Sequence, residues 1–438
     1  MSARNRELFG LIPAALLVTA GFAGVFIQRE NVLSNVSLTY GAIFLALCLA
    51  GHLVIRFTLP YADPYMFPLV ALLASFGIVM VYRINPTDAR QQAQWFVLGL
   101  ILFAATIIAF RDYRKLEQYR YVIVAVSLAL LILPRLPGIG EAANGAYLGV
   151  RLPGGITFQP TEFSKIGLVV FLASYLRDTR QVMVIGARRI LGVTLPPLKY
   201  FGPVLVIWGV AMVILLLLHD IGSSLMFYGA LLAVLYVATA RLSFVVVGMI
   251  AFAVGAWFLG THVAHINGRF ESWLHPFDDR LYHATLGSYQ LANGIFAQAA
   301  GGLFGQGFGQ SVLTIPNTHP VAFLLPFPQT DMIYAVITDE VGLFGAAAVL
   351  IAYLLFVYRG FKAATLARDS FSKLMAAGLS AVFALQVFVI VGGVTRVIPL
   401  TGVTLPFISY GGASIVANFV LLALLLLVSD RARRPVGR

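Results

Sequence analysis

Long apolar runs recur along this chain, and they constrain its fold more than any other feature. A helix needs about 17–25 apolar residues to cross roughly 30 Å of hydrocarbon. Because every backbone amide inside a bilayer must be bonded within the protein, we expect each run to form a helix. The sequence therefore predicts an all-α polytopic membrane protein with about twelve transmembrane helices. The twelve predicted spans, of which 120–134 is the shortest, lie near 8–27, 36–57, 66–82, 94–110, 120–134, 161–176, 201–218, 222–240, 243–262, 331–357, 374–396 and 406–429.

The composition agrees with a membrane protein and excludes a disulfide-stabilised fold. The chain is 60% hydrophobic and 11% charged, whereas a soluble domain is about 25% charged. Its single cysteine, Cys48, falls inside an apolar run, so the sequence offers neither a disulfide framework nor a cysteine-based metal site. The first apolar run has a weak basic flank and is not followed by a recognisable cleavage site. We therefore expect a retained helix rather than a removed signal peptide.

The net charge of +12 could suggest a nucleic-acid partner, but its distribution has a simpler explanation. When the spans alternate from a cytoplasmic N-terminus, 21 of the 30 Lys and Arg residues fall on the inner side and 9 on the outer side. This bias follows the positive-inside rule. It predicts that both termini are cytoplasmic, with 431–438 as a short basic tail, and it requires no nucleic acid.

The same topology places two long segments outside, 135–160 and 263–330. The second far exceeds the usual connection of about 4–6 residues, and such long loops are commonly functional or disordered. It is rich in Phe, Leu, Tyr and Trp rather than in Ser, Glu and Lys, which argues against disorder. We expect a folded extracellular loop lying on the membrane, and it contains the adjacent carboxylates Asp278 and Asp279.

The segment FQPTEFSK, residues 158–165, has the features of a helix start. Pro160 occupies an expected first helical position, and a carboxylate at Glu162 is favoured by the free amides and the helix dipole. Lys165 is three residues further on, within reach of Glu162 on the same face. One interpretation is a capped helix with a local ion pair. The other is a functional site, because ionisable side chains that enter a membrane helix usually mark one.

Further motifs lie at the predicted ends of spans. HDIGSSLMF contains Asp220 between two spans, QTDMIYAVITDE places Asp331 at the outer edge of a helix, and TGVTLPFISYGGAS opens the last span. The glycine-rich GGLFGQGFG, residues 301–309, lacks the GK[ST] of a phosphate loop and, taken alone, indicates a flexible turn. Five histidines fall in or near the long loop, at 262, 265, 275, 283 and 319, without a second ligand set. Solvated histidines are favoured over a zinc site.

Seven motifs, taken in chain order, resemble the signature blocks of the SEDS family. They are NGA, FQPTEFSK, HDIGSSL, RFESWLHPFDD, GGLFGQGFG, QTDMIYAVITDEVGLFG and LTGVTLPFISYGGAS. The family comprises the RodA- and FtsW-like proteins of bacterial cell-wall elongation, division and sporulation, and the resemblance covers roughly 64–430. It implies a ten-helix core at 63–430 that includes the extracellular loop 263–330. Residues 1–62 then supply two additional N-terminal transmembrane helices.

The resemblance implies a peptidoglycan glycosyltransferase of the bacterial cytoplasmic membrane. Such proteins polymerise lipid II into a growing glycan strand at the outer face, beside a class B penicillin-binding protein transpeptidase. The family places its essential Asp three residues after the proline of its loop motif, which corresponds to Asp279 after Pro276. We expect Asp279 to be the general base of an inverting displacement. Asp278 matches a variable position and is expected to be a solvated loop acid.

Other candidate residues follow from the same resemblance. The substrate-binding candidates are Glu162, Lys165, Arg151, Arg269, Asp331 and Ser409. The pyrophosphate leaving group needs cations, for which Arg269, Lys165, Arg151, Arg396 or a divalent ion such as Mg²⁺ or Mn²⁺ are candidates. No other cofactor and no protein-bound structural metal is expected.

The chain also departs from the family pattern, and two other functions stay open. Tyr147, Leu148 and Gly149 stand where the family carries arginines and an aromatic residue. His219 replaces a proline, Gln306 replaces a lysine, and Gln329 replaces a histidine. A lipid II flippase would carry charges through the middle of its spans, whereas the ionisable residues here gather near the outer helix ends. A non-catalytic scaffold of a cell-wall complex would need no loop carboxylate.

Overall fold

The structure is a computed structural model that describes residues 2–30, 35–143, 146–152, 156–185, 188–190, 193–195, 197–284, 287–313 and 324–435. The chain forms two compact units. Unit 1 comprises Met1–Ala109, Glu271–Arg359 and Gln386–Arg438, and unit 2 comprises Phe110–Phe270 and Gly360–Leu385.

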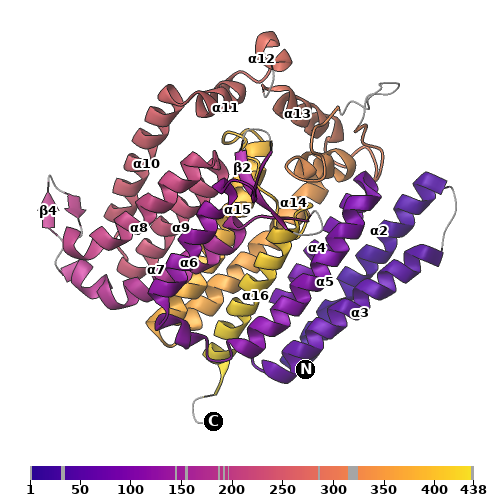
Figure 1. The fold of residues 1–438 in the computed structure, drawn as a ribbon. Coiled ribbons are helices and arrows are strands. Elements are labelled where there is room, and N and C mark those ends of the chain that lie inside the picture. Colours follow the sequence, from indigo (N-terminus) through magenta and orange to yellow (C-terminus); the bar gives the residue numbers. More distant parts are fainter. Residues whose placement is uncertain are drawn as a thin grey trace. The chain divides into compact units, whose positions relative to one another are not determined.

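Helices dominate both units (Figure 1). The first five are α1 (Ala3–Gly10), α2 (Ile12–Glu30), α3 (Asn35–Thr58), α4 (Met66–Ile84) and α5 (Pro86–Ala109). The next are α6 (Arg120–Ile132), α7 (Thr161–Ile185), α8 (Leu198–Leu217), α9 (Ile221–Thr239) and α10 (Leu242–His262). The last are α11 (Ala264–Leu274), α12 (Asp279–His283), α13 (Tyr289–Gly301), α14 (Ile333–Leu366), α15 (Ser370–Val394) and α16 (Gly412–Arg433). Two short 3₁₀ helices, η1 (Tyr113–Glu117) and η2 (Leu133–Arg135), flank α6.

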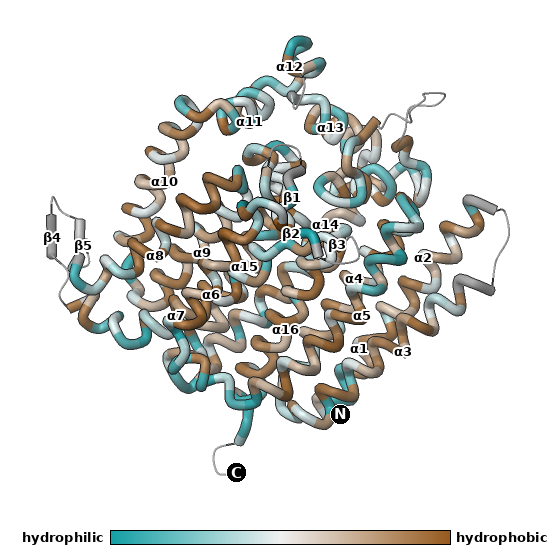
Figure 2. Tube along the Cα trace, viewed as in Figure 1, coloured by the Kyte–Doolittle hydropathy of each residue, from teal (hydrophilic) through white to brown (hydrophobic). Residues whose placement is uncertain are grey.

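Each of the twelve predicted spans overlaps one of these helices, and the all-α membrane fold is confirmed. Among the described residues, ten helices are long and apolar enough to cross a membrane. The remaining two are α6, which has only 13 residues, and α7, whose ends carry five charged side chains. Figure 2 shows the hydrophobic character along the long helices and the hydrophilic character of α12.

The core of unit 1 forms where α5 and α16 pack side by side (Figure 1). Phe419 of α16 contacts the rings of Phe96 and Phe103 of α5. Gly99 of α5 meets the Phe419 ring so closely that a Cβ would not fit there. Small residues of this kind allow membrane helices to approach each other closely.

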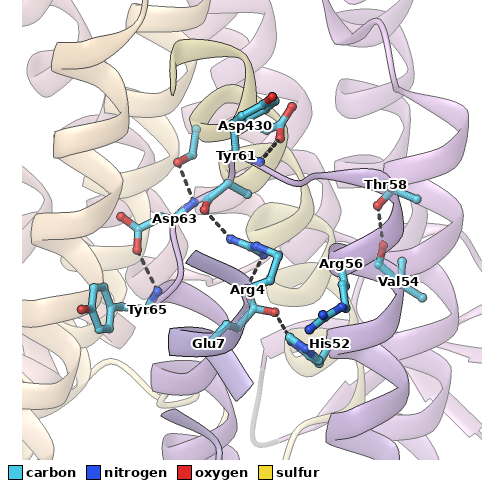
Figure 3. Close-up of polar contacts among 12 residues, drawn as sticks. Arg4, Glu7, His52, Val54, Arg56, Thr58, Tyr61, Asp63, Tyr65 and Asp430 are labelled. Atoms are coloured by element: carbon cyan, nitrogen blue, oxygen red, sulfur yellow. Dashed lines mark hydrogen bonds and ion pairs between the residues drawn. The ribbon is translucent and has the colours of Figure 1, made fainter. Parts of the chain in front are cut away.

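The N-terminal helices join unit 1 through apolar packing and a buried polar network. Helix α2 packs on α3 and α4, and α3 packs on α5. Arg4 and His52 both contact Glu7 (Figure 3): Arg4 donates to its carboxylate, and His52 Nδ1 lies 2.7 Å from Glu7 Oε1. Arg4 also donates to the Ala62 carbonyl. Asp63 in turn pairs with Arg433. The network therefore joins α1, α3, the connection at 59–65 and α16. The predicted domain boundary at residue 62 stays a prediction.

Unit 2 is built on α7, which packs against α6, α8 and α9. Unit 2 also contains a three-stranded antiparallel sheet in the order β1 (Gly140–Ala143), β2 (Ala146–Leu152) and β3 (Ile156–Phe158). A second pair, β4 (Arg188–Ile190) and β5 (Val193–Leu195), forms a short hairpin. The sequence prediction contained no strands, because these segments are too short to show a clear alternation of apolar and polar residues.

The long segment 263–330 is folded over its described residues, as predicted, because it contains α11, α12 and α13. His319 lies outside the described residues. The GGLFGQGFG segment follows α13 directly, and α14 is interrupted at Gly342, which has a φ of 70°. This loop and the start of α14 belong to unit 1.

Candidate active site

Asp278 and Asp279 begin the short helix α12, and they have different environments. The Asp278 side chain caps the helix by accepting a bond of 3.1 Å from the Leu281 amide. Asp279 is the first helical residue, and its side chain is 97% exposed. Its Oδ1 lies 3.3 Å from Nδ1 of His283 on the same helix. The expectation that Asp278 is merely a solvated loop acid was therefore incomplete, since Asp278 supports the helix that presents Asp279.

The side chain of Arg396 bonds the end of α11, a few residues before α12, and we call this set of bonds the Arg396 clasp. The Arg396 Nε donates to the Trp273 carbonyl and its Nη2 to the Leu274 carbonyl, both at 2.9 Å. The Trp273 indole donates back to the Arg396 carbonyl at 3.0 Å. These bonds satisfy carbonyls that the end of a helix leaves without partners. The guanidinium considered for the pyrophosphate is thus bonded to the protein backbone.

A chain of backbone bonds continues from this clasp to Asp279. The His275 amide donates to the Glu271 carbonyl at 2.8 Å, and the Asp278 amide donates to the His275 carbonyl at 3.2 Å. After α12, the Ser288 amide donates to the Leu281 carbonyl at 3.0 Å. The Arg396 clasp therefore sets where the segment leading to Asp279 begins.

Glu162 and Lys165 form the predicted ion pair at the start of α7, with Lys165 Nζ 2.5 Å from Glu162 Oε2. The helix begins at Thr161, one residue after the predicted start at Pro160. Both side chains are buried, with exposed fractions of 4% for Glu162 and 1% for Lys165. A buried pair of opposite charges costs several kcal/mol in lost hydration per ion, so stability alone is a weak reason for it.

Asp220 lies within electrostatic range of both Glu162 and Arg269. It caps α9 by accepting a bond of 2.9 Å from the Ser223 amide, while its Oδ2 is buried without a hydrogen-bond partner among the described residues. Burial raises the pKa of Asp220 above its ordinary value, and the Ser223 bonds and Arg269 oppose that rise. The sequence motif pointed to this residue, but its link to Glu162 depends on tertiary packing.

His265 and His219 also belong to this polar region of unit 2. Their ring centres lie 5.1 Å apart. Burial lowers the pKa of His265, and the nearby Arg269 lowers it further. His265 is thus partly buried rather than fully solvated. His219 adopts a φ of 60°, which proline cannot reach because its ring holds φ near −65°. His219 thus adopts a backbone conformation that the proline expected from the resemblance could not adopt.

Arg151 is held on the small sheet of unit 2. Its Nη2 lies 2.8 Å from Glu141 Oε1, and Thr157 bonds the other oxygen of the same carboxylate at 2.7 Å. The bond from Arg151 lowers the pKa of Glu141. Tyr147, one of the departures from the family pattern, has the Arg135 guanidinium 4.2 Å from its ring centre. Arg135 thus brings a cation to the strand where the family carries arginines.

Ser409 and Asp331 lie in interlocked segments of unit 1. Ser409 is buried, and its hydroxyl donates to the Thr330 carbonyl at 2.7 Å and accepts from the Leu405 amide at 2.9 Å. Asp331 is next to Thr330 and lies beside Gly402. Ser409 therefore positions the segment that carries Asp331, and its hydroxyl bonds are made to the backbone.

The GGLFGQGFG segment is firmly bonded to the start of α14, so the expectation of a flexible turn was wrong. The amides of Gln306 and Gly307 donate to the carbonyls of Asp339 and Glu340 at 2.9 and 3.2 Å. Arg83 of α4 donates to the Gly309 carbonyl at 2.7 Å and pairs with Glu340 at 2.7 Å. Gly305, with a φ of 83°, and Gly342 approach each other where side chains would not fit.

Within unit 2 the structure brings together Glu162, Lys165, Asp220 and Arg269, while Arg151 bonds Glu141 on the sheet. Within unit 1 it brings Ser409 and Asp331 to one region and exposes Asp279 on α12. The described part of the chain holds no group of three or more His, Cys, Asp or Glu side chains that could bind a metal ion.

Known proteins match this chain over nearly its whole length. A family described as cell cycle protein, of the FtsW, RodA and SpoVE type, matches residues 63–434. "Peptidoglycan glycosyltransferase RodA" of Mycobacterium tuberculosis (strain ATCC 25618 / H37Rv) is 39% identical over 444 residues, covering 99% of this chain and 92% of that protein. "Probable peptidoglycan glycosyltransferase FtsW" of Geobacter metallireducens is 33% identical, covering 82% of this chain and 92% of the relative.

A similar fold occurs in a solved peptidoglycan synthase complex, described as coordinating polymerization and crosslinking. The matching chain has a TM-score of 0.66 and 26% sequence identity, and the match covers 85% of this chain and 98% of that one. The similarity to the mycobacterial relative extends through α1–α3, which precede the family match.

Proposed function

This chain belongs to the FtsW, RodA and SpoVE family, and we propose that it polymerises lipid II into glycan strands as a peptidoglycan glycosyltransferase. The resemblance to the SEDS family predicted from the motifs is confirmed by the match over residues 63–434. Relatives named peptidoglycan glycosyltransferase support the enzyme class, and the many apolar helices support a multi-pass membrane protein.

The observation that carries the proposed chemistry is the exposed carboxylate of Asp279 at the start of α12. Extension of a glycan requires a sugar hydroxyl to attack the anomeric carbon that bears the lipid pyrophosphate. A hydroxyl is a poor nucleophile, and a positioned general base contributes about 10²–10⁴-fold. Asp279 accepts the hydroxyl proton as the bond to the anomeric carbon forms and the bond to pyrophosphate breaks. A single displacement inverts the anomeric centre, so one carboxylate suffices.

The departing pyrophosphate carries negative charge that cations must stabilise. Lys165 and Arg269 are the candidates in the buried polar region of unit 2, and Arg151 is a candidate at the sheet. Arg396 is assigned instead to the clasp on α11, since its guanidinium already bonds two carbonyls. A divalent ion such as Mg²⁺ or Mn²⁺ is the alternative source of positive charge, because such an ion is commonly held by one or two carboxylates together with substrate phosphates.

The proposal includes a location and a partner. The positive-inside bias supports cytoplasmic termini and a segment with Asp279 at the outer face of the bacterial cytoplasmic membrane. The similarity to a chain of a peptidoglycan synthase complex supports a crosslinking partner of the class B penicillin-binding type. Lipid II, the growing strand and membrane lipid complete the set of partners.

The test is reconstitution of the purified protein in liposomes with lipid II, alone and with a class B penicillin-binding protein. We expect polymer on gels with the wild type and none with Asp279→Asn at equal insertion. Absence of polymer from the wild type under both conditions, or transfer of lipid II between leaflets without polymer, would overturn the proposal.

A further inference from the structure

An apolar pocket of about 250 Å³ lies among four helices of unit 1, away from every residue assigned above. Helices α2, α3, α4 and α5 all contribute to it, and each of them is long and apolar enough to span a membrane. The lining residues are Val18, Phe22, Tyr40, Ile43, Phe44, Leu47, Ile78, Tyr82, Pro86, Ala89, Arg90, Ala93 and Phe96.

The pocket has a buried apolar floor and an open mouth. Val18, Phe22 and Phe96 are at most 5% exposed, whereas Ile43 is 54% and Tyr40 38% exposed. The floor is aromatic, with the ring centres of Phe22 and Tyr82 only 5.1 Å apart. Because the surrounding helices span the bilayer, the mouth faces hydrocarbon. An apolar cavity of about 150 Å³ already binds benzene, so this one has room for part of a lipid chain.

Arg90 adds a charge to this otherwise apolar lining. It is exposed, and among the described residues it makes no ion pair or hydrogen bond. Four residues separate it from the start of α5, which is roughly 6 Å along the helix axis. A helix of 24 residues is about 36 Å long and exceeds the roughly 30 Å of hydrocarbon. Arg90 also precedes the apolar run of α5, which begins near residue 94, and it therefore lies close to the head groups, where lipid phosphates are available to a guanidinium.

We propose that this pocket binds one chain of a phosphate-bearing membrane lipid, with Arg90 holding the phosphate. Apolar depth next to an exposed cation matches an anionic amphiphile and does not match a neutral one. The pocket forms where α2 and α3, which precede the family match at 63–434, meet α4 and α5, which lie within it, so it requires the N-terminal addition. A phospholipid and a polyprenyl phosphate share this chemistry, and the experiment separates them.

The test uses full-length protein in detergent with three photoreactive probes that carry a diazirine in the chain. The probes are phosphatidylglycerol, a polyprenyl phosphate and a neutral alkyl glycoside of similar length. We expect labelled peptides from α2–α5 with one or both phosphate probes. Ala93→Phe, which fills the pocket, should abolish this labelling. Arg90→Gln should reduce it about tenfold, as expected for loss of one charge-assisted hydrogen bond.

Two matched variants serve as controls. Ala105→Phe makes the same change at an exposed site of α5 outside the pocket, and Arg6→Gln removes an exposed arginine of α1. Both should label like the wild type. If Ala93→Phe does not purify as a folded protein, Ile43→Trp at the mouth tests the same point. Equal labelling by the neutral probe, or equal losses in variants and controls, would overturn the proposal and indicate an adventitious additive only.

Discussion

Asp278 and Asp279 are adjacent carboxylates with different roles, because Asp278 caps α12 while the side chain of Asp279 is exposed. We expect Asp279→Asn to abolish polymerisation, because an amide cannot accept a proton at neutral pH. Asp278→Asn should remain close to the wild type, since Asn is as good an N-cap as Asp. Polymer yield from lipid II at matched protein insertion is the measurement. Equal losses from both variants would mean that the pair acts jointly.

The buried Glu162–Lys165 pair needs a different kind of test. Lys165→Ala alone would remove the cation that pairs with a buried carboxylate and cost about 3–5 kcal/mol, so lost activity could reflect lost folding. The double variant Glu162→Gln with Lys165→Met removes both charges at similar volume, and replacing a buried pair in this way is often nearly neutral for stability. We expect an unchanged melting temperature and little polymer. Full activity per folded molecule would leave the pair a purely structural role.

Residue-scale prediction succeeded where partners are close in sequence. The pairing of Glu162 with Lys165 follows from three-residue helical spacing, and the structure confirms it. Their burial and the proximity of Asp220 and Arg269 could not be predicted, because these residues are joined by tertiary packing. The capping role of Asp278 was missed, since the five-residue α12 is too short to show helical periodicity.

At the scale of elements, the junction of α11 with Arg396 is the contact that we expect to control the Asp279 segment. Arg396→Gln should lower kcat roughly tenfold with little change in KM, because two charge-assisted bonds to the end of α11 are lost. Arg396→Lys should also be impaired, since an ammonium cannot reproduce the planar two-point contact. Hydrogen exchange over 275–283 should rise in both variants.

The Lys variant distinguishes this clasp from a direct contact with pyrophosphate. A phosphate accepts lysine as a point charge, so Arg396→Lys would then retain most of its activity. Near-normal turnover with unchanged exchange in that variant would contradict the clasp and return Arg396 to the cations that bind the leaving group.

Membrane-spanning helices can be predicted from the sequence, whereas short strands and a bonded loop cannot. All twelve apolar runs coincide with helices, because the cost of unpaired amides in hydrocarbon leaves little choice. The sheet of β1–β3 was missed, because its short strands show no clear alternation of apolar and polar residues. The glycine-rich loop was misjudged because its partners on α4 and α14 are remote in sequence.

At the scale of the whole molecule, the N-terminal helices stabilise unit 1 but contain none of the proposed catalytic or substrate-binding residues. Gln28 of α2 donates to the Gly309 carbonyl, and Arg4 donates to the Ala62 carbonyl. Arg83 bonds the Gly309 carbonyl as well, and Asp63 has Arg433 as an ionic partner. Removal of α1–α3 therefore leaves the Gly309 carbonyl bonded to Arg83 and Asp63 paired with Arg433, while the Ala62 carbonyl loses its bond from Arg4.

A chain that starts near residue 60 should therefore insert, melt earlier and still polymerise lipid II. Removing two spans together preserves the in–out alternation of all later spans. The faces of α4 and α5 that become uncovered meet lipid rather than water, so the loss is one of packing and not of hydrophobic burial. Losing a neutral hydrogen bond at the glycine-rich loop costs about 0.5–1.5 kcal/mol, which limits the loss of activity to about tenfold. Thermal melting and polymer yield in liposomes, compared with the full chain, are the measurements. A folded, correctly inserted truncation that makes no polymer would show that α2, through its contact with Gly309, shapes the substrate site itself.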